Sequence, residues 1–116
     1  MECIFCKIAN KEIETKFVYE DEDLVAFNDI HPIAPAHILI IPKKHIGSVN
    51  DQTENDASLV GKMIIVAKNI AKELKISEEG YKLLFRTGKH GGQEVEHIHL
   101  HLIGGAELYE EIRPLK

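Results

Sequence analysis

Residues 97–103 read His-Ile-His-Leu-His-Leu-Ile. Histidine alternates with aliphatic residues, which is typical of a β-strand, because successive side chains point to opposite faces of a sheet. We therefore expect His97, His99 and His101 on one face and the aliphatic side chains in the core on the other. Alternate residues of a strand are about 6.6 Å apart, so the three imidazoles would form a rigid row.

Three interpretations of this histidine row compete. The imidazoles could lie on a solvated face, although three of them in five residues is dense for an ordinary strand. Two or three of them could bind zinc, for which imidazole is a common ligand. His99 could instead act as a nucleophile, because an imidazole with a pKa near 6.5 is largely neutral at physiological pH. We favour the nucleophile because of the residues that surround the row.

Length and composition restrict the class of protein. The 116 residues fit a single domain over residues 1–116, and the acidic, proline-containing residues 106–116 are expected to form a solvated tail. A formal net charge of −5 argues against nucleic-acid binding, which depends on many Lys and Arg contacts with phosphates. The sequence has no run of about 18 apolar residues and does not begin like a signal peptide. We therefore expect a cytoplasmic protein with neither a nucleic-acid nor a membrane partner.

Short periodic segments predict the remaining elements. We expect a short helix over residues 3–9, a hairpin of strands over 17–20 and 24–28, a doubly buried strand over 37–41 and another strand over 81–85. Residues 53–74 have helical periodicity, with Thr53 or Asn55 as the cap and Asp56 in the first turn. This order predicts an α+β domain with a mainly antiparallel five-stranded sheet, one long helix and a short N-terminal helix.

Cys3 and Cys6 are the only two cysteines, and they form a Cys-X-X-Cys pair. In a cytosolic chain this spacing indicates metal or redox chemistry more than a structural disulfide. A redox pair usually follows a central strand, and no strand is expected before Cys3. Zinc is then the better interpretation, although it needs two further ligands. Packing of both thiols as small hydrophobic side chains is an equal alternative.

A glycine-bearing loop over residues 88–93 leads into the histidine row. Backbone N–H groups exposed beside Gly91 and Gly92 could surround a phosphate, or the two glycines could simply form a turn.

Taken together, several stretches resemble the histidine triad family of nucleotide hydrolases and transferases, and within it the Hint-type branch. They span residues 3–105 in the family's order and spacing, and comprise Ile4-Phe5 with Lys7-Ile8, residues 27–32, 35–37 and 41–45, and residues 91–93 followed by 97–102. The resemblance implies a histidine-triad fold and a purine nucleoside phosphoramidase that works through a covalent nucleotidyl-histidine. The alternatives to a phosphoramidase are a dinucleoside polyphosphate hydrolase and a nucleotide-binding regulatory module. The resemblance also implies an AMP-type substrate, a homodimer and no catalytic cofactor.

The resemblance further implies a role for each matching residue. His99 would attack the α-phosphate, and His37, His97 and His101 would complete the catalytic site. Asp29 would accept hydrogen bonds from the ribose, although in isolation it resembles a turn residue. The other matching positions are Ile4, Phe5, Ile8, Phe27 and Ile30, which would enclose the purine but taken alone resemble core residues, and Gly92, Gln93, Glu94 and Val95 beside the phosphate.

Further features of the sequence bear on the resemblance. Some bacterial members bind a structural zinc ion at positions that match Cys3, Cys6, His45 and His97. Arg86 stands where many members carry asparagine near the phosphates, and its fixed charge would strengthen phosphate binding or widen the tolerance for leaving groups. The tail lacks the tryptophan-bearing ending of well-known members. His31 and His90 are expected to be exposed loop residues.

Overall fold

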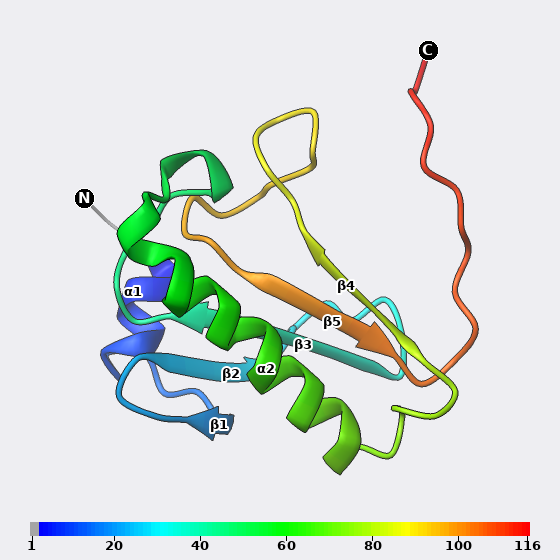
Figure 1. Cartoon of the computed structure of the whole chain (residues 1–116), viewed down its shortest axis with the longest axis horizontal. Helices are drawn as coiled ribbons and strands as arrows, with labels where there is room; N and C mark the ends of the chain where they lie inside the picture. Colours follow the sequence, from blue (N-terminus) through cyan, green and yellow to red (C-terminus); the bar gives the residue numbers. More distant parts are fainter. Residues whose placement is uncertain (1–2) are drawn as a thin grey trace.

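The computed structural model describes residues 3–116. Five strands form one antiparallel sheet in the order β1-β2-β3-β5-β4 (Figure 1). In chain order the elements are α1 (Ile4–Ala9), β1 (Phe17–Glu20), β2 (Leu24–Asn28), β3 (Ala36–Pro42), the 3-10 turns η1 (Val49–Asp51) and η2 (Glu54–Asp56), α2 (Ala57–Glu73), β4 (Tyr81–Phe85) and β5 (Leu100–Gly104). The predicted α+β class and sheet are confirmed. No helix within residues 3–116 combines the length and apolarity that a bilayer crossing requires.

The two helices cover opposite faces of the sheet. Helix α2 lies across one face (Figure 1) and buries Met63, Val66 and Ile70 against Leu100 and Leu102 of β5. Alternate residues of β2 and β3 face the other side, where they pack in a second buried cluster with Phe5, Ile8 and Ala9 of α1. Strand β3 is therefore buried on both faces, as its continuous apolar run predicts. His37 and His101 lie on the α1 side, since His37 shares a face with Leu39 and His101 pairs with Leu39. His97 and His99 lie there too, because Phe5 of α1 packs against both rings.

The start of the long helix differs slightly from the prediction. Residues 54–56 form η2, and α2 begins at Ala57. Thr53 caps η2, and its backbone N–H donates to Asp56 Oδ2 at 2.9 Å. Asp56 thus satisfies an exposed donor at this end of the helix, whereas Asn55 is not the cap.

The predicted histidine strand is shorter than expected, because β5 begins at Leu100 and only His101 lies within it. Pro42, at the end of β3, has no N–H to extend the ladder. Its carbonyl instead accepts a hydrogen bond from His97 Nε2 at 2.8 Å, and Ile98 N–H donates to the carbonyl of Ile46 at 2.6 Å. His97 and His99 therefore lie outside the ladder, and His97 lies in a bend in which its N–H donates to the Val95 carbonyl at 2.9 Å. Phe5 packs edge-on against both rings, so they still share one face as expected.

Candidate active site

Strand register brings His37 and His101 together. Leu39 pairs with His101 and His37 pairs with Ile103, so His37 and His101 are diagonal neighbours on one face. His37 Nε2 lies 2.9 Å from His101 Nδ1, and both side chains are buried. The ring centroids of His99 and His101 are 4.9 Å apart, which extends the cluster along the sheet. Three imidazoles from two neighbouring strands and the segment before β5 therefore form one continuous row.

Backbone partners define the tautomers of His37 and His101. Ile33 N–H donates to His37 Nδ1 at 3.2 Å, so the ring proton of neutral His37 is on Nε2. That proton is donated to His101 Nδ1, and neutral His101 must then carry its proton on Nε2. His101 Nε2 is buried and has no hydrogen-bond partner within residues 3–116. A buried donor without a partner is costly, which indicates that it serves a bound acceptor.

His99 has the opposite tautomer. Its Nδ1 lies 2.8 Å from the carbonyl oxygen of His97, which can only accept, so Nδ1 carries the proton. The lone pair of neutral His99 is therefore on Nε2, as a nucleophile requires. Phe5 packs edge-on against His99, with ring centroids 5.1 Å apart, and restricts the orientation of the imidazole.

The row is held neutral at physiological pH. Burial lowers the pKa of His99 and of His37, because desolvation penalises the charged ring. Burial, with smaller contributions from His99 and Arg86, lowers the pKa of His101 to about 4. All three rings can therefore keep the tautomers that their partners impose.

Asp29 connects the turn after β2 to the histidine row. Its Oδ1 accepts from His31 N–H at 2.8 Å, which is the turn role suggested by its sequence context. Its Oδ2 lies 3.4 Å from His37 Nε2, and the Asp29 side chain is 19% exposed. Asp29 therefore stabilises a turn and retains a carboxylate oxygen beside the row.

A second cluster, the Cys2His2 cluster, consists of Cys3, Cys6, His45 and His97, whose ligand atoms all lie within 4.8 Å of one another. His97 Nδ1 lies 3.2 Å from His45 Nδ1, 3.4 Å from Cys3 Sγ and 3.5 Å from Cys6 Sγ. Because His97 Nε2 donates to the Pro42 carbonyl, its Nδ1 lone pair faces the thiols. The cluster could hold a metal ion, and its His97 residue directly connects it to His99.

The predicted purine-binding residues are brought together only in part. Phe5, Ile8 and Phe27 are buried in the cluster beneath α1, in agreement with their interpretation as core residues. Ile4 and Ile30 are not core residues, because they are 52% and 87% exposed. Ile4 lines a surface hollow of about 420 Å³ together with Glu94 and Val95 and with Cys3 and His45 of the Cys2His2 cluster.

The glycine loop is braced by Gln93. Its Oε1 accepts from Gly88 N–H at 3.0 Å, and its Nε2 donates to the carbonyls of Gly47 and Val95 at 2.7 and 2.9 Å. Gly92 has a φ of +78°, and a Cβ atom on Gly91 would lie 2.3 Å from the Thr87 carbonyl oxygen. The turn interpretation of these glycines is therefore correct, whereas phosphate binding by the loop stays a prediction.

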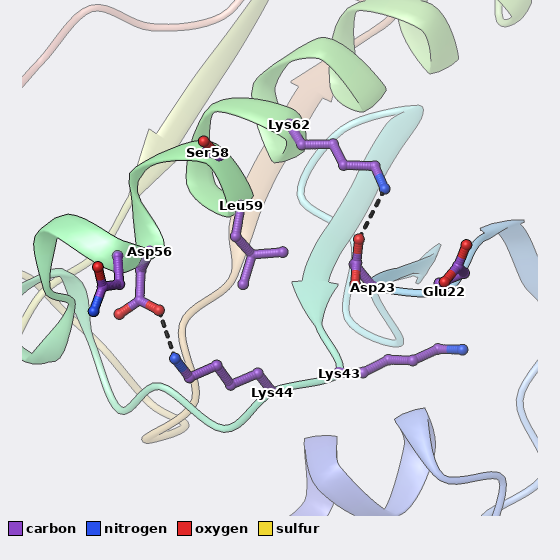
Figure 2. A pocket seen from close by; sticks show the side chains of 9 residues that line it. Glu22, Asp23, Lys43, Lys44, Asp56, Ser58, Leu59 and Lys62 are labelled. Carbon is purple, nitrogen blue, oxygen red and sulfur yellow. Dashed lines mark hydrogen bonds and ion pairs between the residues drawn. The ribbon is translucent and has the colours of Figure 1, made fainter.

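A different cavity, of about 470 Å³, lies between the start of α2 and the β1–β2 turn (Figure 2). Its lysines are paired with carboxylates, since Lys44 contacts Asp56 at 2.6 Å and Lys62 contacts Asp23 at 3.2 Å (Figure 2). It contains no histidine. Its lysines are all engaged by carboxylates, because Lys43 also lies 3.4 Å from Glu20, so the histidine row is the candidate active site.

The sequence did not indicate three backbone groups that orient the site. They are the Ile33 N–H and the carbonyls of Pro42 and His97. Of these groups, only the Pro42 carbonyl could have been suspected from the sequence. A proline ends a strand, so its carbonyl is left without a partner in the sheet. His31 and His90 are exposed, as predicted.

Comparisons with known proteins agree with this geometry. A family model described as "Scavenger mRNA decapping enzyme C-term binding" matches residues 2–110. The purine nucleoside phosphoramidase of Escherichia coli strain K12 is 50% identical over 107 residues, which cover 92% of this chain and 90% of the relative. The structure of a HIT family hydrolase from Legionella pneumophila Philadelphia 1 is 50% identical, with a TM-score of 0.92, and the match covers 94% of this chain and 97% of the other. A histidine triad protein from Clostridium difficile is 44% identical, with a TM-score of 0.93 and 97% coverage of each chain. The chain belongs to the histidine triad family.

Proposed function

We propose that this protein is a purine nucleoside phosphoramidase in which His99 is the nucleophile. The observation that carries the proposal is the hydrogen bond from His99 Nδ1 to the His97 carbonyl, because it leaves the Nε2 lone pair free. The 50% identical Escherichia coli relative is named a purine nucleoside phosphoramidase, which supports the same activity.

The reaction would proceed in two displacements. His99 Nε2 attacks the phosphorus of an adenosine 5′-phosphoramidate, the P–N bond breaks, and the amine leaves after receiving a proton from a general acid. Water then attacks the nucleotidyl-histidine, which releases AMP and restores neutral His99. The unpartnered His101 Nε2–H would donate to a phosphoryl oxygen and stabilise the charge that develops there.

The remaining contacts would hold the nucleotide. Asp29 would accept from the ribose hydroxyls through its partly buried carboxylate, beside His37. The purine would lie near Ile4, Phe5, Ile8, Phe27 and Ile30. The backbone donors of Glu94 and Val95 would face the phosphate, whereas the N–H groups of Gly92 and Gln93 donate to the carbonyls of Lys89 and Gly88 at 3.1 and 3.0 Å.

We also propose that the Cys2His2 cluster binds a structural zinc ion. Tetrahedral zinc, with Zn–S of about 2.3 Å and Zn–N of about 2.0 Å, separates sulfur and nitrogen ligands by about 3.5 Å and two nitrogen ligands by about 3.3 Å. The distances around His97 Nδ1, from 3.2 to 3.5 Å, fit this arrangement. When bound, the ion would anchor α1 to the segment before β5. His97 would then hold His99 through its carbonyl from a fixed position.

A homodimer is proposed on the family resemblance, and exposed apolar side chains of α2 support it. Ile64 and Ile65 are 44% and 53% exposed on that helix. Sedimentation velocity should give the mass of two chains, and a monomer at all concentrations would contradict this.

Turnover of adenosine 5′-phosphoramidate tests the proposed activity. The wild-type protein should release AMP, and His99→Gly should abolish release while remaining folded. His90→Ala, which changes an exposed loop histidine, should retain full activity. Full activity in the His99 variant would refute the mechanism. Faster hydrolysis of a diadenosine polyphosphate than of the phosphoramidate would instead favour a polyphosphate hydrolase.

A further inference from the structure

Cys3 and Cys6 face each other across the first turn of α1. The Cys6 N–H donates to Cys3 Sγ at 3.4 Å, and the two sulfur atoms lie within 4.8 Å of each other. Residues three apart in a helical turn have Cα atoms about 5 Å apart, which is within the range of about 4.4–6.8 Å that a disulfide needs. Rotation of the two side chains can therefore bring the sulfur atoms into bonding distance while the backbone stays in place.

Small solutes can reach these thiols from solvent. Both cysteines are free and only partly buried. Cys3 lines the surface hollow of about 420 Å³ together with His45. Because the chain has only two cysteines, a disulfide within one chain can join only these two. The folded protein therefore allows the redox interpretation of the Cys-X-X-Cys pair, although no strand precedes it.

The same two sulfur atoms supply half of the Cys2His2 cluster. They lie 3.4 and 3.5 Å from His97 Nδ1, so the atoms that would bind the metal are those that a disulfide would join. A structural zinc ion needs four ligands, and cysteine binds it as the thiolate. After disulfide formation only His45 and His97 would remain as ligands. Metal binding and the disulfide therefore exclude each other.

The Cys2His2 cluster is connected to His99 by two contacts. The first is the His97 carbonyl, which accepts from His99 Nδ1 at 2.8 Å. The second is Phe5, which lies between the two cysteines in the sequence. Its ring centroid is 6.0 Å from that of His97 and 5.1 Å from that of His99. A change in the first turn of α1 or at the His97 ring therefore reaches the proposed nucleophile.

We infer that Cys3 and Cys6 form a reversible disulfide that displaces the metal ion and lowers the reactivity of His99. The oxidant is a small-molecule disulfide such as oxidised glutathione. One cysteine attacks it and releases one glutathione thiol, and the other cysteine then attacks the mixed disulfide and releases the second. The effect on His99 rests on the proposed function, whereas formation of the disulfide does not.

Electrons and protons balance in this exchange. The two cysteines lose two electrons, which reduce the oxidant to two thiols. In the metal-free protein the two cysteine protons pass to the departing thiolates. In the metal-bound protein these protons come from solvent as the divalent ion leaves.

Oxidised glutathione added to the zinc-loaded protein tests this inference. Mass spectrometry of the intact protein should show the loss of two hydrogen atoms, and a coloured chelator should detect one released zinc ion per chain. Dithiothreitol should reverse the loss. The imidazole nitrogen signals of His99 should shift, and turnover of adenosine 5′-phosphoramidate should fall by about 10- to 100-fold, the usual effect of losing a group that supports a site residue. Cys6→Ser is the matched variant, because it keeps Cys3 but has no second thiol. It should stop at the mixed disulfide and gain the mass of one glutathione.

Three results would overturn the inference. A wild-type protein that stops at the mixed disulfide would show that the two sulfur atoms cannot meet. A disulfide that forms while zinc stays bound would contradict their mutual exclusion. Unchanged nitrogen signals of His99 in the oxidised protein would contradict the connection to the nucleophile. A wild-type protein that does not hydrolyse the phosphoramidate would instead refute the proposed function, and the mass, the zinc release and the nitrogen signals could still be measured.

Discussion

Replacing His37 with alanine removes the donor that fixes the tautomer of His101. The wild-type chain of hydrogen bonds runs from Ile33 N–H through His37 to His101 Nδ1. Ile33 is 66% exposed, so water can replace the lost acceptor of its N–H at little cost. His101 is 6% exposed, and its Nδ1 would be left unsatisfied in the interior.

The expected loss in the free energy of unfolding follows from the exposed fractions of these two residues. An unsatisfied buried acceptor costs about 1–3 kcal/mol, and partial collapse around the missing ring adds about 1 kcal/mol. We therefore expect His37→Ala to lower the free energy of unfolding by about 2–4 kcal/mol. For a chain of this size that corresponds to a fall in melting temperature of about 10–15 °C. Activity should fall by up to about 100-fold, because His101 no longer presents Nε2–H in a fixed direction.

Calorimetric unfolding and nitrogen NMR of the imidazoles check this prediction together. In the wild-type protein His101 should be the Nε2–H tautomer and His99 the Nδ1–H tautomer. In His37→Ala, His101 should lose its single tautomer while His99 keeps its own. His31→Ala is the matched control, since His31 is an exposed loop residue, and it should change neither quantity. An unchanged His101 tautomer in His37→Ala would refute the hydrogen-bond chain.

Three further predictions concern the metal, the pH dependence and the ribose. The double substitution Cys3→Ser and Cys6→Ser should abolish zinc content by elemental analysis, and zinc that survives both changes would belong to the histidine row instead. Because His101 has a pKa of about 4 when folded and an ordinary value near 6.5 when unfolded, the unfolded chain binds protons first. The contribution of His101 to the free energy of unfolding should therefore be complete above pH 6.5 and should fall as the pH drops toward 4. A melting temperature that is constant over this range would contradict the conclusion that His101 is neutral in the folded protein. Asp29→Asn keeps the turn but loses the charge, so in a binding assay it should remove the preference for AMP over 2′,3′-dideoxy-AMP. An equal loss of affinity for the two nucleotides would exclude a ribose contact.

Most elements of the fold could be predicted because each has a strong local pattern. The bounds of β1, β2 and β4 agree with the expected strands, since β-branched and aromatic runs there end at turn residues. The start of β5 could not be predicted from alternation alone. An extended segment alternates its side chains whether or not it is paired, and pairing before Leu100 is limited by Pro42, which is distant in sequence.

The grouping of the histidines on one face could also be predicted, but the backbone groups that orient each ring could not. Histidine spacing indicates a shared face, whereas the position of each proton depends on backbone groups brought in by folding, such as the carbonyls of Pro42 and His97. The dual position of His97, with its side chain toward two thiols and its carbonyl toward His99, likewise depends on the packing of α1 against the sheet. These contacts join residues that are distant in the sequence, so local sequence patterns do not predict them.

In the proposed mechanism His99 Nε2 forms a bond to phosphorus. Mass spectrometry of the intact protein after brief exposure to an adenosine 5′-phosphoramidate detects that bond. We expect the added mass of one AMP group, mapped to His99 and absent from His99→Gly. Turnover of the substrate by a wild-type protein that never gains this mass, or an AMP group on another residue, would contradict it.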